Sequence, residues 1–330
     1  MLDILCIGDA RIDIFLHVPS DNPHFSLDEK RENMLLEYGG KITIENYSKN
    51  IGGNASNAAI GLARLGKNVG ICVQIGNDEF ASFITNALEA ENINTNLIKK
   101  FVSSTPFSVI LSYKDERTIL IESIKRKYEF NFENTSAKII YLTSLGDDWK
   151  TVYEKALDLV KNREKILAFN PGSLQIEKKD ELVMDLISES DYLFVNKEEA
   201  EGLLHGNGSN LLEEQKQIKK TLFGLKSLGA KNVIITDAEN GIYAHSEKNE
   251  YLHLDIIKVD VVEKTGAGDA FNAGFIAAIL EGKGIQDALI WGSINASSVI
   301  QKTGAQNGLL KKEELLEKLN TLGKYIVLPL

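Results

Sequence analysis

The stretch Glu263-Lys264-Thr265-Gly266-Ala267-Gly268-Asp269 runs directly into the apolar segment Ala270-Phe271-Asn272-Ala273-Gly274-Phe275. Small residues at the start of a predicted helix leave its first N–H groups facing outward, and these amides together with the helix dipole suit a phosphate. A carboxylate beside a phosphate is repelled by it, unless the acid takes a proton from an attacking hydroxyl. The stretch therefore indicates phosphoryl transfer with Asp269 as the base. An aspartate that caps a buried helix would explain the same residues structurally.

The composition limits the class of protein. The chain has 330 residues, 43% of them hydrophobic, which is enough for one large α/β domain and a small accessory element. The net charge is −10, from 37 basic and 47 acidic residues, and the sequence contains no basic block. This balance argues against a nucleic-acid or an anionic-membrane partner. A bound nucleotide would therefore need local amides, Mg²⁺ and a few lysines.

The sequence also predicts where the protein works. Cys6 and Cys72 lie in apolar runs, which predicts buried thiols in a reducing compartment. Their spacing is not that of metal ligands. The N-terminus enters a predicted strand directly, and no apolar run approaches the roughly 18 residues of a membrane span. We expect a cytoplasmic protein with no membrane partner.

Short β-branched runs alternate with amphipathic stretches along most of the chain. Alternation of this length predicts an α/β fold with a mostly parallel sheet covered by helices on both faces. The expected strands are 4–7, 69–75, 139–142, 166–169, 192–195 and 233–236, and the expected helices are 54–65, 79–91, 151–161, 211–228 and 270–281.

Two regions interrupt the alternation. Residues 14–51 are polar and irregular, with one short predicted strand at 41–44. Residues 99–130 predict a hairpin, with strands at 108–113 and 118–121 joined by a turn at 114–117. We expect both regions to build a small β-sheet lid over a site at the C-terminal edges of the core strands. Plain surface excursions are the alternative.

Polar residues at two early positions suit hydroxyl groups. Gly52 and Gly53 precede a helix of small residues and would let a ligand approach the backbone closely. Asn57 offers both a donor and an acceptor, as a sugar hydroxyl requires, while Asn54 either does the same or caps the helix. Asp13, after the first strand, is a candidate to accept hydroxyl hydrogen bonds.

Two later segments are ambiguous when taken alone. Asn196 and Glu199 follow the strand at 192–195, and such a pair can hold Mg²⁺ through water. A capping box explains the same pair structurally. The segment from Thr236 to Gly241 reads as a turn between two strands. No P-loop motif and no dinucleotide-binding glycine fingerprint is present, which argues against those two classes.

In this order, the segments resemble the ribokinase-like (PfkB) carbohydrate kinase family over essentially the whole chain. The two diagnostic motifs of the family match residues 52–66 and 265–274. The resemblance implies a single kinase domain over 1–330, a three-layer α/β/α fold with a β-sheet lid formed by about 14–51 and 99–130, and ATP as cofactor. It also implies transfer of the ATP γ-phosphoryl group to a hydroxymethyl group of a sugar or nucleoside.

The resemblance assigns roles to individual residues. It makes Asp269 the base, which the helix start would keep ionised at neutral pH. The remaining roles are an anion hole at Gly266, Ala267 and Gly268; substrate binding at Asp13, Gly53, Asn54 and Asn57; Mg²⁺, through water, and phosphate at Glu199 with Asn196; and nucleotide binding at Thr236, Gly241 and, beside the adenine, Asn295.

This chain departs from the family pattern in places. Glu263 stands where an aspartate in several members helps bind a monovalent cation, so K⁺ dependence is an open question. Ala81 and Ala238 occupy positions where glycine is frequent, and Asn307-Gly308 replaces a common Pro or Ser.

The absence of a lysine at position 54 predicts the class of acceptor. Asn54 stands where ribokinases and phosphofructokinases of the family typically have lysine, which disfavours a phosphorylated acceptor. We expect an unphosphorylated sugar, with a nucleoside as the alternative. Phe15, Phe25 or Tyr38 of the lid would stack on a sugar or a base, or belong to the core. A catalytically idle sugar-binding regulator is a third interpretation. Exposed lid edges favour a homodimer.

Overall fold

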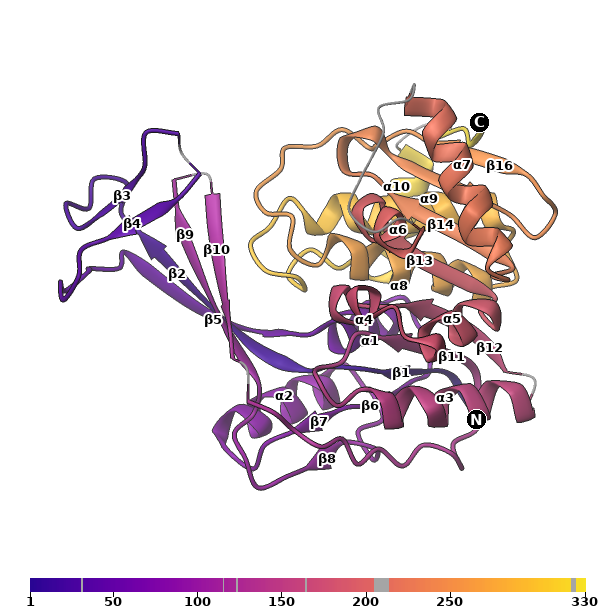
Figure 1. Ribbon diagram of the computed structural model, residues 1–330, viewed down its shortest axis with the longest axis horizontal. Coiled ribbons are helices and arrows are strands. Elements are labelled where there is room, and N and C mark those ends of the chain that lie inside the picture. The colour runs from indigo at the N-terminus through magenta and orange to yellow at the C-terminus, as the bar shows by residue number, and fades with distance from the viewer. Residues whose placement is uncertain (31, 115, 123, 164, 205–213, 322–324) are drawn as a thin grey trace.

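The computed structural model describes residues 1–30, 32–114, 116–122, 124–163, 165–204, 214–321 and 325–330. Within these ranges the main sheet has nine strands, in the order β17-β16-β15-β14-β13-β12-β11-β1-β6 (Figure 1). Its parallel strands are β1 (Leu2–Ile7), β6 (Val69–Cys72), β11 (Ala137–Thr143), β12 (Ile166–Asn170), β13 (Tyr192–Asn196) and β14 (Asn232–Thr236). Its antiparallel edge is formed by β15 (Ile242–His245), β16 (Tyr251–Leu254) and β17 (Leu328–Pro329).

The central strands are apolar on both faces because helices cover both faces. On β1, Ile4 and Cys6 pack into one buried cluster, whereas Leu5 and Ile7 pack into a second cluster on the opposite face. All four side chains are fully buried, and burying a side chain of this size stabilises the fold by about 1.5–3 kcal/mol. A continuous apolar run of this kind is what a doubly covered parallel strand requires.

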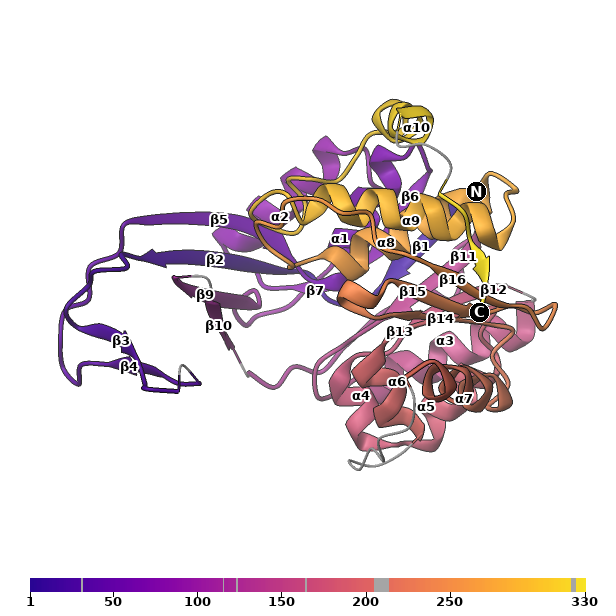
Figure 2. The same ribbon diagram turned by 90° about the horizontal axis from the view of Figure 1, so that it is seen from above.

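Two helical layers enclose the sheet, as Figure 2 shows from above. One layer contains α1 (Asn54–Arg64), α2 (Glu79–Ala90), α8 (Ala267–Leu280), α9 (Ile285–Val299) and α10 (Lys312–Thr321). The other contains α3 (Lys150–Arg163), α4 (Ser173–Lys178), α5 (Glu181–Ser188), α6 (Lys197–Leu204) and α7 (Glu214–Ser227). The predicted three-layer α/β/α fold with a mostly parallel sheet is confirmed.

A second sheet projects from this body (Figure 1). Its order is β10-β9-β2-β5, formed by β10 (Glu116–Ile121), β9 (Phe107–Tyr113), β2 (Arg11–Val18) and β5 (Asn46–Gly52). The pairing is mixed, since β2 is parallel to β9 and antiparallel to β5. A further hairpin of β3 (Phe25–Leu27) and β4 (Met34–Leu36) lies at its outer end. We call the four-stranded unit the small sheet, and the predicted hairpin of residues 99–130 supplies two of its strands.

Several expected boundaries differ from the structure. Residues 41–44 form no strand, because the chain pairs with β2 only from Asn46 onward and the Thr43 carbonyl instead accepts a hydrogen bond from Asn22 Nδ2 at 3.0 Å. The expected strand 69–75 is divided into β6 and β7 (Gln74–Ile75), and β7 pairs with β8 (Lys99–Lys100). Tyr128 and Phe130 leave the small sheet and are buried in the core. The expected start of the helix at 211–228 lies outside the described residues.

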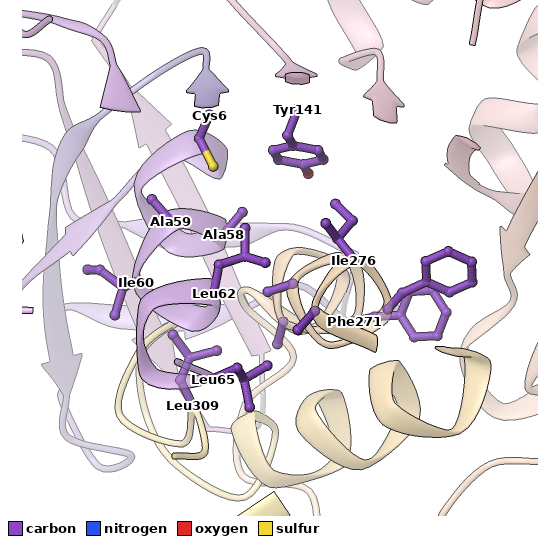
Figure 3. Packing of buried hydrophobic residues seen from close by; sticks show 14 of the residues in the cluster. Cys6, Ala58, Ala59, Ile60, Leu62, Leu65, Tyr141, Phe271, Ile276 and Leu309 are labelled. Atoms are coloured by element: carbon purple, nitrogen blue, oxygen red, sulfur yellow. The ribbon is translucent and has the colours of Figure 1, made fainter. Parts of the chain in front are cut away.

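Helix α8 lies unusually close to its two neighbours. A Cβ on Gly61 of α1 would stand 2.8 Å from Ala273 Cβ, and a Cβ on Gly274 would stand 2.6 Å from the Trp291 carbonyl of α9. In Figure 3, Ala58 and Leu62 of α1 and Ile276 of α8 lie together beneath the sheet. Glycine at these contacts lets the helix backbones approach, and the contact holds α8 against α1 and α9.

The same ranges contain no candidate for a transmembrane helix, because none of their helices combines sufficient length with sufficient apolar character.

Gly274→Ala should separate α8 from α9, because the added methyl group would collide with backbone atoms of Trp291 and Gly292. We expect a loss of about 1–3 kcal/mol in the free energy of unfolding, the usual cost of overpacking, measured by urea denaturation. The exposed Gln286→Ala in α9 should change this quantity by less than about 0.5 kcal/mol. Equal stabilities for the two variants would contradict the close contact.

Candidate active site

The loop before α8 presents backbone amides to open space. Gly266, at φ +78°, takes a left-handed conformation and packs against Ala305, where a Cβ would overlap the neighbouring residue. Ala270 makes the first i→i−4 bond, to the Gly266 carbonyl at 2.9 Å. The Gly268 amide therefore precedes the regular hydrogen bonds of the helix, and a Cβ on Gly268 would meet nothing within 4 Å. The Ala267 amide makes a long bond, 3.3 Å, to Lys264.

Asp269 lies in the first turn of α8 and is buried, with 8% of its surface exposed. Burial raises the pKa of its carboxyl to about 7, although the hydrogen bond from Asn57 lowers it; the nearby carboxylates of Asp13 and Glu199 raise it further. We expected the helix start to lower the pKa of Asp269 and keep the acid ionised, but burial acts in the opposite direction. The group titrates near neutral pH, where a general base is most useful.

Asn57 is held between Asp269 and a residue from the far end of the chain. Its Nδ2 donates to Asp269 Oδ2 at 2.9 Å, and its Oδ1 accepts from Gln306 Nε2 at 2.9 Å. Because Gln306 donates to the oxygen, the amide of Asn57 is oriented with its nitrogen toward the carboxylate. The structure thus brings two predicted site residues, 212 positions apart, into direct contact.

Asp13 and Gly53 meet where the small sheet joins the body. Asp13 lies on β2 against Gly52, so closely that a Cβ on Gly52 would overlap its carboxylate. Gly53 has φ +93°, and a Cβ there would stand 2.5 Å from the Asp9 carbonyl. Burial raises the pKa of Asp13, while Arg11 and a hydrogen bond from Ser108 lower it. Asp13 and Gly53, both predicted to bind substrate, therefore lie at the junction between the small sheet and the body.

A polar pocket of about 190 Å³ opens beside Asp269. It is lined by side chains at the C-terminal ends of core strands and by the loop before α8, including Asn54, Asn170, Asn196, Glu199, Thr236, Lys264, Gly266, Ala267, Gly268, Asp269 and Asn272. Parallel strands end at the same edge of a sheet, which explains why residues from distant segments converge here.

Asn196 and Glu199 form the capping box that we weighed against a metal role. The Asn196 amide donates to Glu199 Oε2 at 2.9 Å, and the Glu199 amide donates to Asn196 Oδ1 at 2.8 Å. Both residues also line the polar pocket, so the box leaves the other Glu199 oxygen outside these two bonds. Burial raises the pKa of Glu199. In the described ranges, no group of three His, Cys, Asp or Glu side chains is placed to hold a metal ion.

A larger apolar pocket of about 520 Å³ adjoins the first and shares Thr236, Lys264, Ala267 and Gly268 with it. Its other walls include Gly241, Ile242, Ile257, Val259, Phe271, Ser293, Ala296 and Ile300. Gly241 has φ +87°, and Ala238, where relatives often have glycine, is itself left-handed at φ +37°. An apolar pocket that meets the first amides of a helix can hold a flat group at one end and an anion at the other.

Asn295 and Glu263, which we predicted beside the adenine and at a monovalent cation, both make contacts within the protein. Asn295 is fully buried and lines neither pocket; it donates to the Ala270 carbonyl at 2.8 Å and accepts from the Leu310 amide at 3.1 Å. Glu263 is paired with Arg117 at 3.0 Å and accepts from the Gly304 amide at 2.7 Å.

The aromatic residues expected in the lid do not converge on a ligand. Phe15 and Phe25 are buried, at 1% and 3% exposure, while Tyr38 is fully exposed. Stacking of Phe15 or Phe25 on a base or sugar is therefore excluded in this arrangement.

Some residues of the site were missed by the sequence analysis. Asn170 and Asn272 line the polar pocket, where Asn272 donates to Tyr141 and to Asn170. Asn170 follows a buried strand, as Asn196 does, so its position at a strand end was a usable signal. No local pattern marks Gln306 as the partner of Asn57.

A buried carboxylate thus lies beside the first amides of a helix, at the strand-end edge of an α/β/α fold, and this arrangement suits phosphoryl transfer. The sequence profile of the pfkB family carbohydrate kinases matches residues 1–312. The chain belongs to this family of carbohydrate kinases.

The family relatives act on different acceptors. The chain is 29% identical to a ribokinase of Haemophilus influenzae over 84% of this chain and 90% of the relative. It is 27% identical to a 5-dehydro-2-deoxygluconokinase of Clostridium perfringens, over 89% and 95% of the two chains. It is also 27% identical to a nucleoside kinase of Methanocaldococcus jannaschii over 97% of each.

A solved structure agrees with the fold. The ribokinase of Thermotoga maritima superimposes with a TM-score of 0.79 at 26% identity, covering 97% of this chain and all of the other. The fold is therefore the ribokinase fold, as the sequence predicted.

Asp269→Asn should stabilise the protein in a pH-dependent manner. The folded-state pKa of about 7 exceeds the ordinary value of 3.8, so ionising Asp269 opposes folding, and wild-type stability falls as pH rises between these values. An amide carries no such penalty. We expect the variant to gain on the order of 2 kcal/mol in the free energy of unfolding at pH 8, and less at pH 5. Urea denaturation at both pH values measures this.

The exposed Asp287→Asn in α9 is the matched control, and should shift the free energy of unfolding by less than about 0.5 kcal/mol. A destabilised Asp269→Asn at pH 8 would show that the burial of this charge is not a cost to the fold.

Proposed function

We propose that the protein is an ATP-dependent kinase that transfers the γ-phosphoryl group to a hydroxymethyl group of an unphosphorylated sugar. The observation that carries this proposal is Asp269. Its buried carboxyl, with a pKa of about 7, lies in the same helical turn as the Gly268 amide and is oriented by Asn57. A base and an anion hole so close together suit a hydroxyl that attacks a phosphoryl group.

ATP would occupy the two adjoining pockets. The apolar pocket, with Gly241 in its wall, has the size of a small-ligand site and would take the nucleoside part. Thr236, Ala267 and Gly268 lie at its junction with the polar pocket, which Gly266 also lines and where the phosphates would bind. The position of Asn295 assigns it a structural role, which holds the start of α8 against the 304–310 segment.

The residues present fit a Mg²⁺ ion held mainly by phosphate and water. Mg²⁺ keeps several waters in such sites and takes one or two carboxylates from the protein. Glu199, oriented by Asn196 and facing the polar pocket, would hold that hydration shell. Bound there, the ion would neutralise phosphate charge; this chain's amides and Lys264 would do the same from the opposite wall.

The acceptor would lie between α8 and the small sheet. Asp13, Gly53 and Asn54 surround this junction, and the Asp13 carboxylate is close enough to raise the pKa of Asp269. Such a site suits neutral hydroxyl groups and repels a phosphorylated acceptor. Phosphoryl transfer depends mostly on positioning and charge neutralisation, so Asp269 would receive the hydroxyl proton as the phosphoryl group is transferred.

A nucleoside acceptor is the second candidate, because the archaeal nucleoside kinase aligns over 97% of the chain. The burial of Phe15 and Phe25 leaves Tyr38 as the exposed member of the three aromatic residues considered for stacking, and it would serve a sugar or a base alike. An idle regulator is disfavoured, since Asp269 would serve as base, the Gly268 amide would bind an anion and Asn57 would orient the carboxyl group.

We further infer that the small sheet acts as a lid and joins two copies of the chain. Ile119, Leu120 and Ile121 of its edge strand are 43%, 53% and 63% exposed, and an open apolar edge readily pairs with another strand. Both cysteines are free and buried, in keeping with the cytoplasm as the site of action.

Asp269→Asn should lower turnover by about 10²–10⁴-fold, the range of general-base catalysis, and leave nucleotide affinity nearly unchanged. Steady-state kinetics and calorimetric titration with ADP measure the two quantities, and Asp287→Asn is again the control. Turnover within about tenfold of wild type would contradict the role of Asp269 as base.

The acceptor class is tested by ADP release from MgATP with a panel of pentoses, hexoses, keto-deoxy sugar acids, sugar phosphates and nucleosides. We expect turnover on an unphosphorylated sugar and none on its phosphate ester. Preferred turnover on a nucleoside would support the second candidate, and ATP binding without turnover on any member would support the idle regulator.

A further inference from the structure

An ion pair joins the small sheet to the loop before α8. Arg117 lies on β10, and its Nη1 is 3.0 Å from Glu263 Oε1 and donates to Thr265 Oγ1 at 2.5 Å. Glu263 and Thr265 belong to the segment that leads into the anion hole, 146 and 148 positions further along the chain. The guanidinium group therefore brings a permanent positive charge beside the amides at Gly266–Gly268.

Glu263 extends this contact to a second loop. Its Oε2 accepts from the Gly304 amide at 2.7 Å, where Gly304 is left-handed at φ +88°. The neighbouring Ala305 packs directly on Gly266. Glu263 thus connects Arg117, the anion-hole loop and the 304–306 segment, from which Gln306 orients Asn57 toward the base.

These contacts do not fit a monovalent cation at Glu263, the position where the family resemblance implied one. One carboxylate oxygen is paired with a guanidinium group, and the other already accepts a backbone N–H. A potassium ion here would have to displace Arg117 or bind beside its like charge. The Glu263 side chain is only 12% exposed, so water screens little of that repulsion.

We propose that Arg117 takes the place of a monovalent cation beside the anion-hole loop, so that this enzyme needs no potassium. The inference rests on the kinase function proposed above and assigns Arg117 as a positioning residue, which acts through Glu263 and Thr265. Arg117 belongs to the small sheet, so the geometry of the anion hole depends on the position of that sheet.

An ordinary surface ion pair is the competing explanation, because many such pairs contribute little. The two explanations differ in what happens when the arginine is removed. If Arg117 is only a surface ion-pair partner, its removal does not change catalysis. If it substitutes for a cation, its removal exposes the Glu263 carboxylate, where a potassium ion can then bind.

The test compares full-length wild type, Arg117→Ala and Arg117→Lys in tetramethylammonium buffer and in potassium buffer of equal ionic strength. Wild-type turnover should differ by less than about twofold between the buffers, an effect too small for a lost cation. Arg117→Ala should lose about tenfold or more in kcat without potassium, with a smaller change in acceptor KM, and should regain activity on adding potassium or guanidinium. Arg117→Lys should retain more activity than Arg117→Ala.

A second measurement requires no turnover. The thermal unfolding midpoint of wild type should be the same in both buffers, whereas that of Arg117→Ala should rise in potassium. Lys125→Ala removes an exposed positive charge from the same segment and should behave as wild type in both measurements.

Activation of wild type by potassium, or Arg117→Ala kinetics equal to wild type without potassium, would overturn the proposal. Failure of the proposed function would instead leave wild type without turnover on every acceptor. The thermal shifts would still report on Arg117 in that case, so the two failures are distinguishable.

Discussion

The close approach of helix α8 to α1 and α9 is the constraint on which the site depends. Glycines at the helix contacts allow backbone separations that any Cβ would prevent, and the contact places the first turn of α8 at the edge of the sheet. Because Asp269 and the amides proposed as an anion hole lie at the start of α8, their relative positions follow from the helix itself. Packing about one helical turn beyond Asp269 therefore supports the geometry of the proposed site.

The electrostatics of the site follow from this placement. Burial raises the pKa of Asp13, Glu199 and Asp269, and the carboxylates of Asp13 and Glu199 raise that of Asp269 further. Opposed to them are backbone amides, Lys264 and, through Glu263, the guanidinium of Arg117. Charges of both signs thus meet where a phosphoryl group would pass from donor to acceptor. Asp13, Arg117 and Glu199 come from separate segments, whereas Lys264, the amides and Asp269 belong to the one stretch 263–269.

The features that depend on residues close together in the chain could be predicted from the sequence. The glycine turn before Asp269, the alternation of strands and helices and the hairpin at 107–121 each depend on neighbouring residues. Contacts between distant residues could not be predicted. Nothing near Arg117 or Gln306 reveals partners 146 and 249 positions away. The strand expected at 41–44 was wrong because β-branched residues indicate strand propensity, whereas pairing with β2 begins only at Asn46.

The span of the Asn57 contacts also affects how the protein is made. Asn57 emerges from the ribosome early, yet its two partners follow 212 and 249 residues later. Until then α1 has no α8 to cover it, so its apolar face is exposed on an incomplete chain. Contacts of such sequence separation slow folding and leave intermediates prone to aggregation. Synthesis of this protein therefore passes through a long stage in which its N-terminal half benefits from chaperone protection, and the last helices to emerge complete both the core and the site.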